Sequence, residues 1–61
     1  ANWEAMRSKL AVLHEQREQI DGYISQAATD GKFDELISLR AAMEEVCEEI
    51  YRIDQMLLTY G

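Results

Sequence analysis

Apolar residues recur at alternating intervals of three and four positions in both halves of the chain. In the first half this series comprises Trp3, Met6, Leu10, Leu13, Ile20, Ile24 and Ala27. In the second half it comprises Leu36, Leu39, Met43, Val46, Ile50, Ile53, Leu57 and Tyr60. Arg17 occupies the one polar position of the first series, and we expect its head group to reach Glu49 or another nearby acid. Because this spacing places each series along one face of an α-helix, the pattern predicts two long amphipathic helices.

The dipeptide Asp30-Gly31 is the one convincing break between these helices. The chain contains no proline, and glycine readily adopts the left-handed conformation that ends a helix. We therefore expect one helix over about residues 2–29, a turn near Asp30-Gly31, and a second helix over about residues 33–60. Asn2 can cap the first helix, and Asp34 and Glu35 fall in the first turn of the second, where negative charge is favourable.

The two apolar series mirror each other about the turn. Their members pair outward as Ala27 with Leu36, Ile24 with Leu39, Ile20 with Met43, Arg17 with Val46, Leu13 with Ile50, Leu10 with Ile53, Met6 with Leu57 and Trp3 with Tyr60. A single continuous helix would not require this symmetry. The sequence therefore predicts an all-α fold, a two-helix antiparallel hairpin that spans residues 1–61 as one unit and is part of a larger protein. We call the paired positions the seam.

Composition excludes several classes of function. Twelve acidic and six basic residues give a net charge of −6, which would repel a nucleic-acid backbone. One cysteine, Cys47, and one histidine fall short of a zinc site, so we expect no metal or other cofactor. The acidic run around Cys47 is typical of a solvated helix face. No apolar run is long enough to cross a membrane. Without a nucleophile–base pair or a phosphate-binding glycine loop, we expect a binding module and no enzyme.

Apolar residues outside the seam indicate a partner. Along one flank of the second helix they form a series that we call the outer stripe: Phe33, Ile37, Cys47, Tyr51 and Leu58. Near the turn this stripe adjoins seam residues and forms a shallow apolar patch with a charged border. We expect partner binding there, through Ile20, Asp21, Tyr23, Ile24, Ala27, Ala28, Phe33, Asp34, Ile37 and Arg40, with the centre at Ile24, Phe33 and Ile37. Ala28 faces the same flank as Phe33, whereas Tyr23 lies on the opposite one.

A family resemblance indicates the class of protein to which the partner belongs. The segment IDGYISQAATDGKFDELISLRAAM, residues 20–43, and more loosely residues 13–50, resembles the Rab-binding helical hairpin of rabenosyn and its fungal relatives. The matching positions are Ile20, Tyr23, Ile24, Gln26, Ala27, Gly31, Lys32, Asp34, Glu35, Leu36, Leu39 and Met43. Gln26 and the block from Gly31 to Glu35 make the match specific, because a coiled coil does not require them.

The resemblance implies an effector-type module that binds the GTP-bound form of a Rab small GTPase in endosomal membrane traffic. It implies contact with the switch regions through exposed apolar residues beside the turn, and a cytoplasmic location, peripheral to endosomal membranes through the parent protein or partner. The alternative is a structural coiled coil in which the outer stripe is buried in a homodimer, forming a four-helix bundle.

Overall fold

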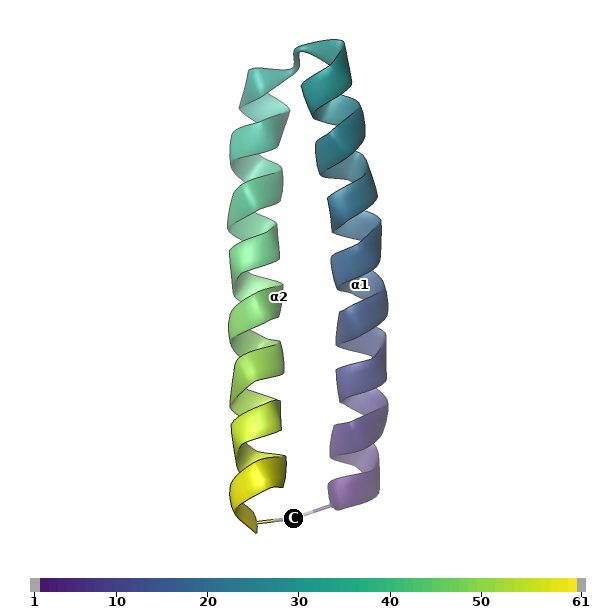
Figure 1. Cartoon of the computed structure of the whole chain (residues 1–61), viewed down its shortest axis with the longest axis vertical. Coiled ribbons are helices and arrows are strands. Elements are labelled where there is room, and N and C mark those ends of the chain that lie inside the picture. Colours follow the sequence, from purple (N-terminus) through teal and green to yellow (C-terminus); the bar gives the residue numbers. More distant parts are fainter. Residues whose placement is uncertain (1, 61) are drawn as a thin grey trace.

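Two antiparallel helices of equal length form the whole of the described structure. In this computed structural model, which describes residues 2–60, α1 spans Trp3–Asp30 and α2 spans Phe33–Tyr60. Figure 1 shows the helices side by side, joined by a short turn at one end, with the start of α1 and the end of α2 at the other. A 28-residue helix is about 42 Å long, in agreement with the longest dimension of 44 Å. The predicted hairpin and turn are confirmed. Ala1 and Gly61, the ends of the predicted unit, lie outside the described residues.

The residues at the two ends of α1 explain where this helix begins and ends. The Asn2 side chain accepts a hydrogen bond of 3.0 Å from the Ala5 backbone N–H, so Asn2 caps α1 from outside the helix. At the other end Gly31 takes φ 70° and ψ 24°. Its N–H and that of Lys32 donate to the carbonyl groups of Ala28 and Ala27, which forms a Schellman motif. Gly31 is the first residue to leave the helical conformation, so α1 continues to Asp30, one residue beyond the expected end.

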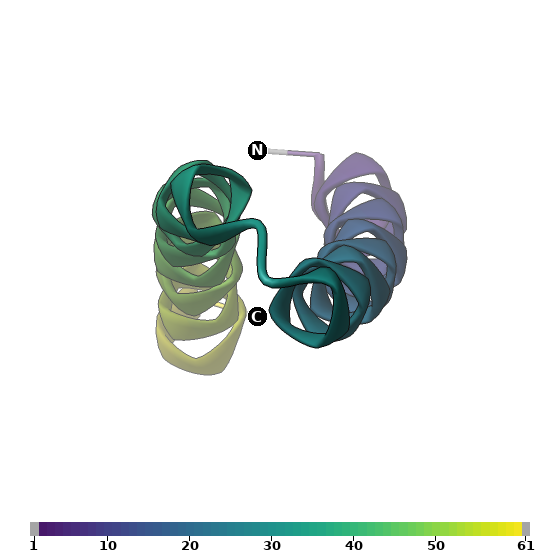
Figure 2. The ribbon, with the colours of Figure 1, turned by 90° about the horizontal axis from the view of Figure 1, so that it is seen from above.

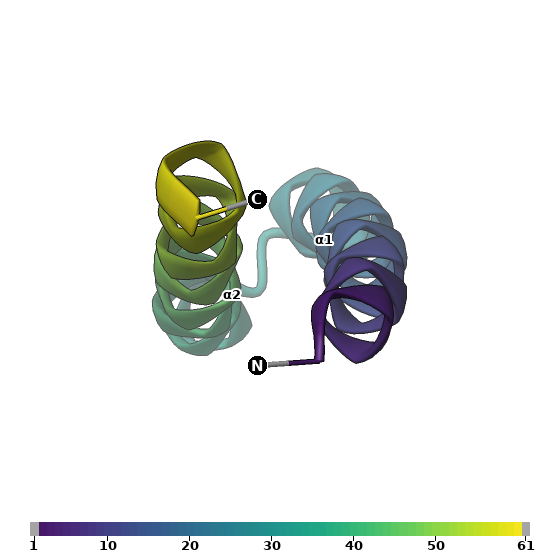
Figure 3. The same ribbon diagram turned by 90° about the horizontal axis from the view of Figure 1, so that it is seen from below.

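The core is a thin line of side chains between the helices. Leu13, Ile50 and Ile53 are buried together, and partly buried apolar residues extend this cluster on both sides: Met6, Leu10, Val46 and Leu57. Figures 2 and 3 view the hairpin from its two ends and show one layer of two helices, and within residues 2–60 no third element covers them. Most seam residues near the turn are therefore half-buried, and Ala27 is the buried one.

Three expectations about the seam require correction. Arg17 is exposed, and Glu49 bonds to Lys9 instead, with 2.7 Å between Lys9 Nζ and Glu49 Oε1. Lys9 reaches Glu49 from a position beside the seam, which leaves the long Arg17 side chain in solvent. Tyr60, expected to pair with Trp3 in the seam, is 71% exposed. Tyr60 is the last residue of α2, and its side chain does not pack into the seam.

Substitution by alanine should have opposite effects on stability at the two interior glycines, Gly22 and Gly31. An added Cβ would contact nothing within 4 Å at either position, so only backbone conformation separates them. Gly31→Ala would force a left-handed conformation on alanine and should destabilise the hairpin by about 1–2 kcal/mol. Gly22→Ala, inside α1, should stabilise it by about 1 kcal/mol. Thermal unfolding followed by circular dichroism measures both. A shift of the two melting temperatures in the same direction would contradict this assignment of the turn.

The Lys9–Glu49 pair predicts a small pH dependence. The hydrogen bond from Lys9, followed by its positive charge, lowers the pKa of Glu49 from the ordinary value of 4.5. A folded-state pKa below the unfolded one stabilises the fold above pH 4.5, and this contribution disappears as the pH falls through the folded-state pKa. We expect Lys9→Met to raise the pKa of Glu49 toward 4.5, as measured by NMR titration of its side-chain carboxyl carbon. An unchanged pKa would show that Lys9 does not hold this carboxylate in solution.

Candidate functional site

The ten predicted contact residues do not form one surface. Three of them belong to the seam: Ala27 is 3% exposed, and Ile20 and Ile24 are half-buried. The remaining seven are exposed: Asp21, Tyr23, Ala28, Phe33, Asp34, Ile37 and Arg40. The exposed set is divided between the two flanks of the hairpin, because steps of three and four residues along α2 keep Phe33 and Ile37 on one side of the seam. The turn end therefore presents two candidate surfaces.

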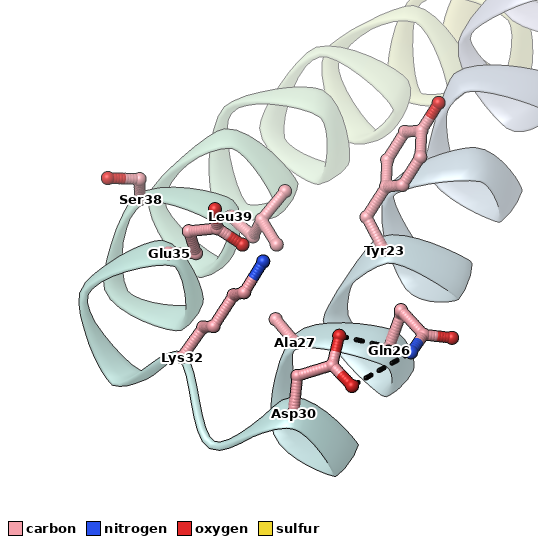
Figure 4. Close-up of a pocket in the computed structure, with 8 residues that line it drawn as sticks. All are labelled: Tyr23, Gln26, Ala27, Asp30, Lys32, Glu35, Ser38 and Leu39. Carbon is pink, nitrogen blue, oxygen red and sulfur yellow. Dashed lines mark hydrogen bonds between the residues drawn. The ribbon is translucent and has the colours of Figure 1, made fainter.

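The first surface is a shallow groove between the two helices at the turn, which we call the turn-end groove. Its lining residues are Tyr23, Gln26, Ala27, Asp30, Lys32, Glu35, Ser38 and Leu39. Figure 4 shows Ala27 and Leu39 between the helices, where they form an apolar floor. The Tyr23 ring stands on the α1 side of this floor and is 62% exposed. Such an opening suits one apolar side chain of a partner.

Charged and polar groups surround this floor. Gln26 Nε2 donates to both carboxylate oxygens of Asp30, each at 3.1 Å, and these bonds orient the acid at the end of α1. On the α2 side, Lys32 extends over the groove beside Glu35 (Figure 4). Among residues 2–60 the one ion pair joins Lys9 to Glu49, so Asp30, Lys32 and Glu35 keep their charges available. A polar border around an apolar centre is the usual anatomy of a protein-binding surface.

The second surface is the outer stripe on the opposite flank. Phe33 and Ile37 are 71% and 70% exposed, and neither lines the turn-end groove. Farther along α2, Cys47 and Tyr51 line a second shallow depression together with Glu44, Glu48 and Arg52. Within residues 2–60 no group of three or more Cys, His, Asp or Glu side chains is placed to hold a metal ion. The side chains of this depression therefore suggest no metal-binding role for it.

Six residues of the groove were absent from the predicted contact set: Gln26, Asp30, Lys32, Glu35, Ser38 and Leu39. A signal for three of them was present in the sequence, since Gln26, Lys32 and Glu35 belong to the part of the motif that a coiled coil does not require. Tyr23 shares this property and was predicted. The predicted contact set is centred on the most apolar exposed residues, whereas the groove combines an apolar floor with polar motif positions.

Comparison with known proteins gives one match. A family model described as Rabenosyn Rab binding domain matches residues 12–53. This range contains the turn, the whole turn-end groove and the outer stripe as far as Tyr51, and it confirms the resemblance found in the sequence. Searches of the curated proteins and of the solved structures each returned no match.

Proposed function

The chain belongs to the Rabenosyn Rab binding domain family and is a Rab-binding module, and from this premise we propose that it recognises the GTP-bound form of a Rab GTPase in endosomal traffic. The switch segments of a small GTPase are ordered by the γ-phosphate and Mg²⁺ and released after hydrolysis. A module that contacts these segments therefore distinguishes the two nucleotide states. Family membership supports a binding role without catalysis.

We propose the turn-end groove as the main docking surface for the Rab. The observation that carries this assignment is the convergence of Tyr23, Gln26, Lys32 and Glu35 on one groove. These four positions belong to the family motif, yet the seam of a coiled coil requires none of them. Ala27 and Leu39, which the motif also contains, supply the floor. Seam packing explains the other aliphatic motif positions and the turn explains Gly31, so Asp34 is the one remaining motif residue that does not line the groove.

The side chains of the groove indicate which groups of the Rab would contact it. An apolar or aromatic side chain from a switch segment would lie on Ala27 and Leu39 against the Tyr23 ring, the one aromatic side chain of the groove. Basic groups of the Rab would approach Asp30 and Glu35, and an acidic group would approach Lys32. Such border charges chiefly set orientation and association rate. This arrangement requires both helices, so binding depends on the folded hairpin.

This proposal divides the predicted contact set. Tyr23 and Ala27 remain Rab contacts, with Ile20 and Ile24 supporting them from the seam. Asp21, Ala28 and Asp34 remain predicted Rab contacts, whereas Phe33, Ile37 and Arg40 lie along the flank of α2 that carries the outer stripe, for which we infer a different role. Between residues 2 and 60 neither helix has a segment long and apolar enough to span a membrane. We propose that the module reaches endosomal membranes through the Rab or through its parent protein.

Calorimetric titration tests the proposal. The module is titrated into a panel of endosomal Rab GTPases, each loaded with a non-hydrolysable GTP analogue or with GDP. We expect saturable binding to one or a few members in the GTP form and at least tenfold weaker binding to the same members in the GDP form. Equal affinity for both nucleotide states would refute nucleotide-dependent recognition. Absence of binding across the panel would refute the endosomal Rab assignment.

A further inference from the structure

The outer stripe belongs to a second coiled-coil pattern on α2. With the polar residues between its members included, exposed positions recur at alternating steps of four and three along almost the whole helix. They are Phe33, Ile37, Arg40, Glu44, Cys47, Tyr51, Asp54 and Leu58, of which Asp54 alone is partly covered. Five of the eight are apolar, and the large ones among them are 64–79% exposed. A stripe with this repeat can pack along the whole length of a second helix. In the described structure α1 covers only the seam.

We propose that this stripe packs against the same stripe of a second copy of the chain, with the two α2 helices antiparallel about a two-fold axis beside Ala42. In this register Phe33 faces Tyr51 of the second copy, and Ile37 faces Cys47. Arg40 faces Glu44 of the second copy. The two-fold axis repeats each pair, so every stripe position from Phe33 to Tyr51 meets a side chain of matching character.

The pairing chemistry selects this register over its neighbours. A shift by one heptad toward the C-terminus sets Asp54 against Ile37 and Glu44 against Cys47. A shift by a further heptad sets Glu44 against Asp54, two acids, at a buried position. A parallel dimer sets Arg40 against Arg40 and Glu44 against Glu44. Like charges and unpaired charges in such positions are destabilising. The antiparallel register about Ala42 alone pairs aromatic with aromatic, aliphatic with thiol, and cation with anion.

The charge pattern of the stripe favours a second copy as its occupant. A foreign helix would need an acid opposite Arg40 and a base opposite Glu44 at the correct spacing, and this chain already carries both. The border is less favourable, because Asp34 and Glu48 of the two copies approach each other outside the stripe, and each copy carries a net charge of −6. Salt at physiological strength screens such exposed charges beyond about 8 Å.

The size of the contact indicates weak association. The stripe from Phe33 to Tyr51 is 19 residues long, which corresponds to about 28 Å of helix. One helix face of this length buries less than the roughly 1,200 Å² typical of stable complexes, so we expect a dissociation constant in the micromolar range or weaker. The turn-end groove lies on the opposite flank and stays open in the dimer, which would then present two groove sites. This inference stands independently of the Rab proposal.

Sedimentation equilibrium tests self-association without any Rab present. The folded module is measured from about 10 μM to about 1 mM, together with Ile37→Asp and the matched control Val12→Asp, which places the same charge on the flank opposite the stripe. We expect a concentration-dependent shift toward dimer for the wild type and for Val12→Asp, and at least tenfold weaker association for Ile37→Asp. A monomer throughout the range, or equal weakening by both variants, would overturn the proposal.

Disulfide trapping tests the register, because Cys47 is the only cysteine in the chain. Ile37→Cys places a thiol opposite Cys47 of the second copy, so mild oxidation should yield a covalent dimer on a non-reducing gel. Wild type should yield little, since its two Cys47 residues are separated by about 15 Å along the helix axis. Tyr51→Cys lies far from both cysteines of the second copy in the proposed register, and it would be trapped only in the register shifted by two heptads. Faster trapping of Tyr51→Cys than of Ile37→Cys would overturn the proposed axis.

Discussion

Replacement of Leu13 by alanine should remove about 2–4 kcal/mol from the free energy of unfolding and leave the hairpin largely unfolded at room temperature. Leu13 is 5% exposed and packs against Ile50 and Ile53 at the centre of the core cluster. A hairpin has no second layer that could collapse into the cavity. Because single domains are stabilised by only about 5–15 kcal/mol, and small ones by less, such a loss is a large share of the total.

Leu58→Ala is the matched control for this prediction. The chemical change is the same, yet Leu58 is 79% exposed, so unfolding of the monomer should change by less than about 0.5 kcal/mol. Urea titration followed by circular dichroism at 222 nm compares the two variants at a concentration where the chain is monomeric. Equal destabilisation by the two substitutions would mean that the core does not lie where the structure places it.

Tyr23→Ala should weaken binding of the GTP-bound Rab by at least about 30-fold, equivalent to about 2 kcal/mol. Tyr23 is the one aromatic residue that lines the turn-end groove, and a buried tyrosine at the centre of an interface is a common source of binding energy. Because Tyr23 is 62% exposed in the free module, its removal should leave the helical content unchanged. Calorimetry measures the affinity, and circular dichroism confirms the fold.

Tyr51→Ala is the matched control for Tyr23→Ala. It removes the same side chain from a position of nearly equal exposure, since Tyr51 is 64% exposed on the opposite flank. It should weaken Rab binding less than threefold while it weakens self-association. If Tyr51→Ala lost Rab affinity and Tyr23→Ala kept it, the outer stripe would be the Rab contact. That result would support the contact set predicted around Phe33 and Ile37.

The hairpin was predictable because its determinants are local and periodic. Steps of three and four residues define the seam, and Gly31 is the one position that combines a break in the pattern with a residue suited to positive φ. The mirror symmetry of the two apolar series then gave the antiparallel pairing. Corrections were needed where long side chains choose among several partners, as when Lys9 and not Arg17 bonds to Glu49.

The groove was less accessible to sequence analysis for a physical reason. It exists because the Schellman turn returns α2 beside α1 at a fixed offset, so that Tyr23 and Glu35, twelve positions apart, border the same opening. The small side chain of Ala27 then leaves space between them. Hydrophobicity alone directs attention to Phe33 and Ile37, which are more exposed than any residue of the groove floor.

The most direct test of the docking surface is an NMR titration of the isotope-labelled module with a Rab GTPase loaded with a GTP analogue. We predict that the largest amide perturbations fall at Tyr23, Gln26 and Leu39, together with the side-chain amide of Gln26, and that the same Rab with GDP causes few. Perturbations centred on Phe33, Ile37 and Tyr51, with the groove unaffected, would contradict the assignment of the groove to the Rab.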